Sequence, residues 1–290
     1  MTPLDRALRI GGAGAARRMG VIAGAYVWHA GFASAVAWPI AKLVADPVVA
    51  HPRLDRVLFE PGGLYLLEAL RLVRGPLTSA GEGLCFGVLA GLYLGLVPLG
   101  ALLYALSRDE ILSFAKLMGA AGRYFAPLSL LLGLFLVATA FTCSVPLTVA
   151  SLLETKFRNA LGDRGADIAY ATFVALSFAL AALFGVAHDL ARAALVGRGL
   201  NALDAARAGV EGIRAHPAEA IGGWALRGVS MVLLVTIAAR ATTHIGVESS
   251  ANFASVALVH QSVAFLLVYL RADWLALAVR LTAGTQVRER

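Results

Sequence analysis

The chain has 290 residues, of which 59% are hydrophobic and 15% are charged, and its formal net charge at pH 7 is +7. Soluble domains carry about 25% charged residues, so this composition excludes an ordinary water-soluble domain. It also argues against nucleic acid as a partner, because that function requires a basic face on a soluble domain.

Six predominantly apolar runs predict transmembrane helices, because each is long enough to cross a hydrocarbon core of about 30 Å. In chain order they cover residues 19–44, 83–106, 124–153, 168–188, 220–244 and 253–270. The first run follows four arginines, as in a signal peptide. It exceeds the roughly 7–15 apolar residues of a signal-peptide core, so we expect it to stay uncleaved. The predicted fold is all-α: one integral membrane domain over residues 1–290, a polytopic bundle of about six transmembrane helices with amphipathic interfacial helices.

The predicted spans place 15 basic residues on one side of the membrane and 9 on the other, with Arg227 inside a span. Because basic loops tend to stay cytoplasmic, we predict that both termini are cytoplasmic and that residues 46–82 and 154–167 face outwards. A basic cytoplasmic face would suit anionic lipid headgroups. Arginine, alanine and glycine are abundant. This bias is typical of a GC-rich bacterium, so the predicted location is the bacterial inner membrane.

Two segments outside the spans show the periodicity of amphipathic interfacial helices. Ser107 and Glu110 fit a capping box, which predicts that a helix begins at residue 107 and continues to about residue 118. Residues 66–73 repeat the amphipathic pattern on the predicted outer side. Both are expected to lie on the surface of the bundle.

A third amphipathic helix is predicted over residues 201–215, beginning near Asn201 and ending before Pro217. Its predicted apolar face comprises Leu203, Ala206, Val210 and Ile213. Its charged residues are Asp204, Arg207, Glu211 and Arg214. These charges make it a candidate docking helix for a protein partner or for anionic headgroups, and the alternative is a surface helix that only covers the bundle.

The order span, amphipathic helix, span occurs over residues 83–153 and again over residues 168–244. Both halves have the same predicted orientation, which raises the hypothesis of a weak internal duplication. In the second span, Gly87, Gly91 and Gly95 recur at every fourth residue. This spacing predicts that a neighbouring helix packs closely against them.

Polar residues within or beside the spans form a candidate intramembrane polar cluster, because ionisable groups there are costly unless they are paired. Its members are Asp189, Arg192, Glu219, Arg227, His260 and Gln261. We predict that Arg227 pairs with Asp189, with Glu219 as a second candidate partner. Arg192 could compete for Asp189 from three residues further along the same helix. His260 and Gln261 are expected to form hydrogen bonds between helices, and Arg227 could instead bind a substrate.

No motif of an enzyme or of a cofactor site is present in the sequence. A serine or cysteine nucleophile in a GxSxG setting, paired intramembrane aspartates and a Gly-rich phosphate loop following a strand are all missing. The histidines form neither an HxxxH nor an HExxH pattern. The sequence therefore predicts no catalytic residue, no cofactor and no metal, although a membrane enzyme can assemble a site from scattered residues.

The segments 189–196, 202–209 and 214–217 carry a family resemblance, in the residues DLARAALV, ALDAARAG and RAHP. They resemble uncharacterised bacterial six-helix membrane proteins, some of which are similar to the membrane segment attached to glycerophosphodiester phosphodiesterases. The resemblance implies fold and location, and it carries over no catalytic residue.

Three functional classes follow from these observations. The first is a non-catalytic membrane subunit or scaffold that docks a partner through its cytoplasmic amphipathic helices. The second is a transporter or permease-like protein for a small solute or lipid, and the third is an intramembrane enzyme that modifies lipid. We favour the first, because the polar residues inside the spans are too few for a dedicated ion pathway.

Overall fold

The computed structural model describes residues 14–49, 87–245 and 250–284. Its labelled helices, in chain order, are α2 (Met19–Val49), α5 (Leu96–Leu106), α6 (Phe114–Arg198), α7 (Ala202–Ala215), η2 (Ala218–Gly222), α8 (Gly223–Ile245) and α9 (Ser250–Gly284). All regular secondary structure in these ranges is helical, so the all-α prediction is confirmed for the described part of the chain.

Five helices in the described ranges are long and apolar enough to cross a membrane, by length and composition. They are Met19–Trp38, Gly87–Leu106, Phe114–Arg198, Ala218–Ile245 and Ala251–Ala283. Helices of this length and apolarity support the prediction of a membrane protein with transmembrane helices.

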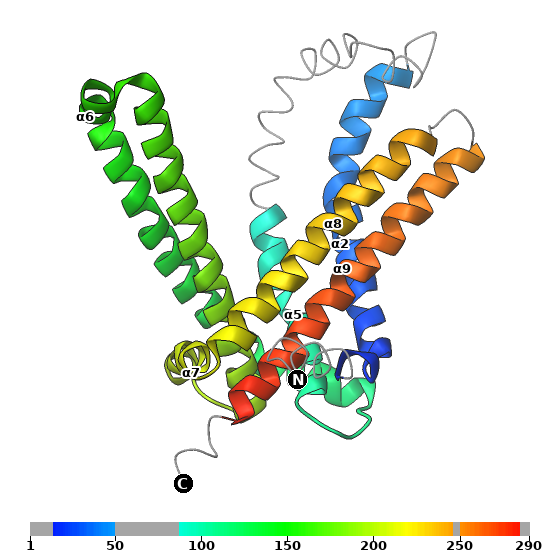
Figure 1. The fold of residues 1–290 in the computed structure, drawn as a ribbon. Coiled ribbons are helices and arrows are strands. Elements are labelled where there is room, and N and C mark those ends of the chain that lie inside the picture. The colour runs from blue at the N-terminus through cyan, green and yellow to red at the C-terminus, as the bar shows by residue number, and fades with distance from the viewer. Residues whose placement is uncertain (1–13, 50–86, 246–249, 285–290) are drawn as a thin grey trace.

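The longest of these helices, α6, reverses direction at Gly162 and forms two antiparallel arms (Figure 1). Gly162 has φ of 70° and ψ of 176°, a conformation essentially restricted to glycine. Cys143 and Ser177 connect the arms, because the Ser177 hydroxyl donates to the Cys143 carbonyl at 3.1 Å. The sequence predicted a loop over 154–167, but helix continues on both sides of the glycine.

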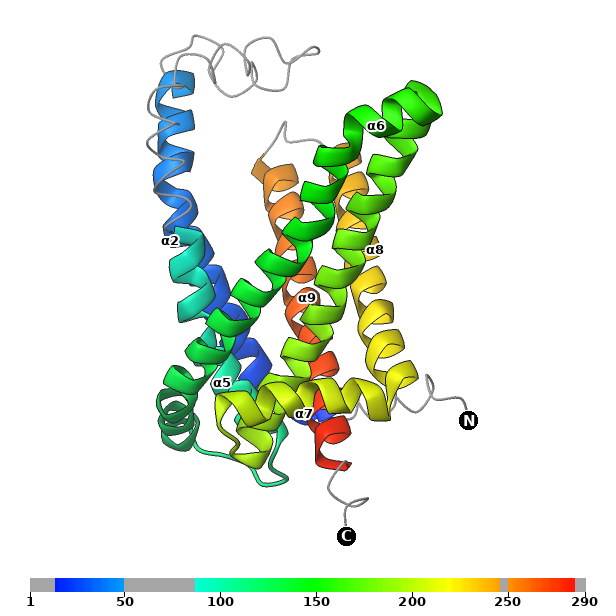
Figure 2. The same ribbon diagram turned by 90° about the vertical axis from the view of Figure 1, so that its left-hand side faces the viewer.

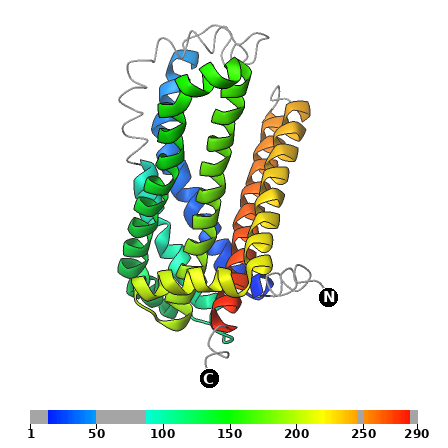
Figure 3. The same ribbon diagram turned by 60° about the vertical axis from the view of Figure 1, so that its left-hand side comes forward.

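α7 lies across one end of the bundle, roughly perpendicular to the long helices (Figures 2 and 3). We call this end the α7 end. The beginning of α2 and the end of α9 also lie there (Figure 2). The largest fully buried side chains gather on helices that meet at this end, among them Leu103, Leu190, Leu195, Trp274 and Leu277.

Away from the α7 end, α6 diverges from α8 and α9 (Figure 1). The diverging segments expose large apolar side chains such as Phe141, Phe178, Val232 and Ile237. A soluble protein rarely exposes so much contiguous apolar surface, so these faces suit contact with lipid.

The glycine repeat of the second predicted span packs against α2, as the spacing predicted. A Cβ atom added to Gly91 would lie 2.6 Å from a ring carbon of Phe32, and one added to Gly87 would lie 3.2 Å from Val36. Glycine at these positions therefore leaves room for the Phe32 and Val36 side chains of α2.

The predicted helix start at Ser107 is wrong. Residues 107–113 are not helical, and α6 begins at Phe114, where Ser113 is the N-cap and accepts from the Lys116 amide at 3.4 Å. Ser107 instead terminates α5, and its hydroxyl donates to the Tyr104 carbonyl at 2.9 Å. Ser107 therefore fits the capping-box pattern in sequence but caps the end of a helix rather than its beginning. The helix predicted over residues 66–73 lies outside the described residues.

Candidate functional site

The last part of α9 is the centre of the α7 end. Every residue from Ala272 to Val279 is buried, so this segment is enclosed on all sides by the other helices. A polar side chain in such a position must find a partner inside the protein. Asp273 and Trp274 belong to this buried segment, and Arg271 immediately precedes it.

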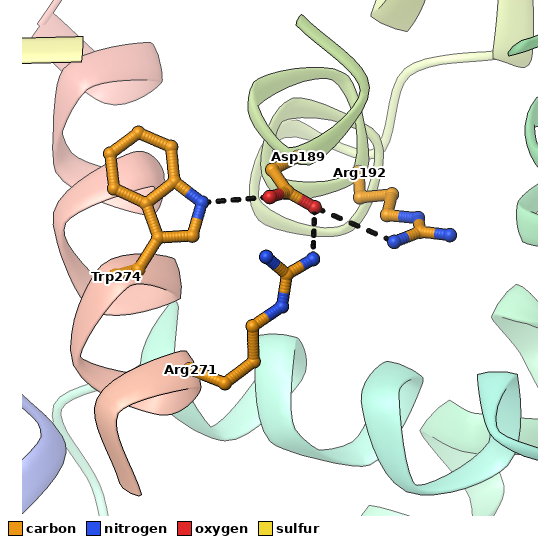
Figure 4. A network of polar contacts seen from close by, with 4 residues as sticks. All are labelled: Asp189, Arg192, Arg271 and Trp274. Carbon is orange, nitrogen blue, oxygen red and sulfur yellow. Dashed lines mark hydrogen bonds and ion pairs between the residues drawn. The ribbon is translucent and has the colours of Figure 1, made fainter. Parts of the chain in front are cut away.

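Asp189 of α6 accepts hydrogen bonds from three side chains (Figure 4). The indole N–H of Trp274 donates to Asp189 Oδ2 at 2.8 Å. Arg271 donates to Oδ1, and Arg192 donates to the same oxygen at 3.5 Å. Asp189 is 2% exposed, and charge-assisted bonds of this kind are stronger than neutral ones. This carboxylate therefore ties α6 to α9.

Arg227 of α8 forms an ion pair with Asp273 of α9 and donates to the Gly223 carbonyl at 3.0 Å. The sequence named Asp189 as its partner, and that prediction is wrong. The predicted last span ended at residue 270, whereas α9 continues to Gly284 and brings Asp273 beside α8. We call Asp189, Arg192, Arg227, Arg271, Asp273 and Trp274 the α9 clasp, because its contacts join α6 and α8 to α9.

The structure places the other predicted cluster members separately. Glu219 is within 3.5 Å of His216, its neighbour three residues earlier. Gln261 accepts a hydrogen bond of 2.5 Å from the Tyr26 hydroxyl, which confirms its predicted bond between helices. His260 is exposed, and no hydrogen bond of its side chain is found within the described residues. Arg192, the competing partner that the spacing allowed, lies 3.5 Å from Asp189.

Sequence analysis missed Arg271, Asp273 and Trp274 as site residues. Two signals could have identified them. The apolar run that follows, from Leu275 to Val279, indicates that the helix does not end at residue 270. Arg271 and Trp274 are also three residues apart, a spacing that places both on one helix face.

The α9 clasp is suited to holding helices together. Both of its carboxylates accept from an arginine of the chain, so their charges are compensated within the bundle. Among the described residues, no group of three or more His, Cys, Asp or Glu side chains could hold a metal ion. His188, next to Asp189, stacks on Phe135 with the ring centroids 4.5 Å apart.

α7 is the second candidate surface, and its bounds agree with the prediction. Asn201 is the N-cap, and its side-chain oxygen accepts from the Asp204 amide at 2.9 Å. The helix ends at Ala215, with His216 as C-cap.

The predicted apolar face of α7 is only partly correct, because Ala206 and Ile213 pack against the core whereas Leu203 and Val210 do not. The face that packs into the bundle consists of small residues, namely Ala202, Ala205, Ala208, Gly209 and Gly212. The reason is the close approach to α6: a Cβ atom added to Gly209 would lie 2.9 Å from the Ala191 amide nitrogen. Leu203 and Val210 remain exposed, and Arg207 and Arg214 are exposed as well.

Comparisons with protein-family models, with curated proteins and with solved structures found no match.

Proposed function

We propose that the chain is an inner-membrane protein of a bacterium, with six spans and both termini in the cytoplasm. Each arm of α6 counts as one span in this proposal. The excess of basic residues on one predicted side supports this orientation. A second support is that α7, the beginning of α2 and the end of α9 all lie at the same end of the bundle (Figure 2).

We further propose that the protein is a non-catalytic scaffold that docks a protein partner through α7. The observation that carries this proposal is the exposed surface of α7, on which Leu203 and Val210 accompany Arg207, Arg214 and Glu211. We call these five residues the α7 face. Arginine is enriched at protein interfaces, and the buried core of an interface is more apolar than the rest of the surface.

Transport of a solute and chemistry on lipid would both draw on the polar residues inside the bundle. We prefer the scaffold because those residues bond to one another. Asp189 accepts from three side chains, and Arg227 is paired with Asp273. Groups engaged in this way are poor ligands for a solute.

Site-specific photo-crosslinking in native cells tests the docking role. A photoreactive residue at position 210 is expected to give one discrete protein adduct, and Arg207→Glu with Arg214→Glu is expected to remove it. Arg158→Glu is the matched charge control, because Arg158 is exposed on α6 near the reversal at Gly162. Adducts with lipid alone, or a protein adduct that survives the charge reversal of α7, would contradict the docking role.

A further inference from the structure

An apolar groove lies between α2, α5 and the first turns of α6. Its volume is about 550 Å³, within the range of about 300–1,000 Å³ that is common for small-molecule sites. Its lining includes Gly20, Gly24 and Trp28 from α2, Ala101 from α5, and Phe114 and Met118 from α6. Arg17 and Arg18 line the same groove. We call it the α2–α5 groove.

The α2 side of the groove is open. A Cβ atom added to Gly20 or Gly24 would meet nothing within 4 Å. On the opposite wall, Ile111 is 95% exposed and Phe114 is 78% exposed. Large apolar side chains and empty space face each other here, so an acyl chain can pack against both walls.

The charge at the beginning of α2 is not neutralised within the described part of the chain. Arg18 donates to the Arg108 carbonyl, and neither Arg17 nor Arg18 forms an ion pair with a described acidic side chain. Of the two acids in the neighbouring loop, Glu110 lies 3.8 Å from Lys116. The groove therefore combines apolar walls with two arginines that can receive an anion.

The length of the groove fits one leaflet of a bilayer. From Arg18 to Trp28, α2 rises about 15 Å at 1.5 Å per residue. Half of a hydrocarbon core of about 30 Å has the same length. The charged end of the groove belongs to the α7 end, because α2 begins there (Figure 2). An acyl chain lying along α2 would thus have its headgroup level with the arginines.

We propose that the α2–α5 groove binds an anionic phospholipid, with the phosphate against Arg17 and Arg18 and one acyl chain between Trp28 and α5. This site is separate from the α7 face, and its occupancy does not depend on a docked protein. The lipid contributes both the negative charge and the apolar chain that the groove lacks.

The test is native mass spectrometry of the purified, delipidated full-length protein titrated with phosphatidylglycerol or phosphatidylcholine. The wild-type protein is expected to retain phosphatidylglycerol in preference to phosphatidylcholine. Gly24→Leu fills the groove from an open position and should weaken retention about tenfold. Gly31→Leu is the matched control, because Gly31 also faces open space on α2 but does not line the groove.

The charge arm uses Arg17→Gln, which leaves the Arg18 bond to Arg108 in place. One basic residue near an anionic lipid raises the affinity for that lipid about fivefold. Arg17→Gln is therefore expected to weaken phosphatidylglycerol binding by this factor and to leave phosphatidylcholine binding unchanged. The melting temperature of each variant shows that it is folded. Equal retention of both lipids, equal losses in Gly24→Leu and Gly31→Leu, or displacement of the lipid by inorganic phosphate alone would overturn the proposal.

Discussion

The pair of Arg227 and Asp273 offers the sharpest test of the α9 clasp. The side chains are 3% and 9% exposed, so removing one partner leaves the other charge buried. Breaking a buried ion pair in this way costs about 3–5 kcal/mol. We therefore expect Arg227→Met and Asp273→Leu each to lower the free energy of unfolding by about this amount. The double variant should recover most of the loss, because two apolar residues of similar size replace the pair.

Arg207 and Asp204 on α7 provide the matched control. Their side chains are 79% and 49% exposed at a distance of 3.6 Å, and an exposed pair contributes about 0.2–1 kcal/mol. Arg207→Met should therefore change the free energy of unfolding little. Reversible unfolding in mixed detergent micelles measures all four variants and gives the coupling between positions 227 and 273. The pairing is refuted if the single losses simply add, or if position 227 couples to Asp189 instead.

Two further substitutions test other contacts by the same unfolding measurement. Trp274→Phe removes the N–H that donates to Asp189 and should lower the free energy of unfolding by about 1.5–3 kcal/mol. Trp38→Phe, at an exposed position, should lower it by less than about 0.5 kcal/mol. Similar losses for the two variants would contradict the hydrogen bond. Gly209→Leu forces a side chain against the Ala191 backbone and should lower the free energy of unfolding by at least about 1–3 kcal/mol. Gly122→Leu is the control, because position 122 faces open space. A stable Gly209→Leu protein in which α7 still resists proteolysis would show that α7 and α6 are not tightly packed there.

Local features of the fold were predictable from the sequence because they depend on neighbouring residues. Asn201 and Pro217 bound α7 as expected, and the spacing of Asp189 and Arg192 places them in contact on one helix. The glycine repeat of the second span predicted the close approach of α2, since small residues at every fourth position leave one helix face without side chains.

The remaining features depend on contacts between distant segments. Asp273 lies 46 positions from Arg227, and no sequence pattern relates the two. The buried face of α7 was misjudged for a similar reason. Hydrophobicity favours Leu203 and Val210 for burial, but the short distance to α6 admits only residues as small as Gly209. The reversal at Gly162 was not predicted, because residues 154–167 were interpreted as a loop. A single residue with a positive φ angle is enough to reverse the helix there.

The most direct test of a membrane bundle with α7 in the cytoplasm is the side of the membrane from which single cysteines can be labelled. Cys85 and Cys143 are first replaced by serine, and then Arg207→Cys on α7 or Asp163→Cys beside the α6 reversal is introduced. A membrane-impermeant maleimide applied to intact spheroplasts is expected to label position 163 and to leave position 207 unlabelled. In inverted membrane vesicles, position 207 should be labelled and position 163 should not. Labelling of both positions from one side, or of position 207 from outside, would contradict the account.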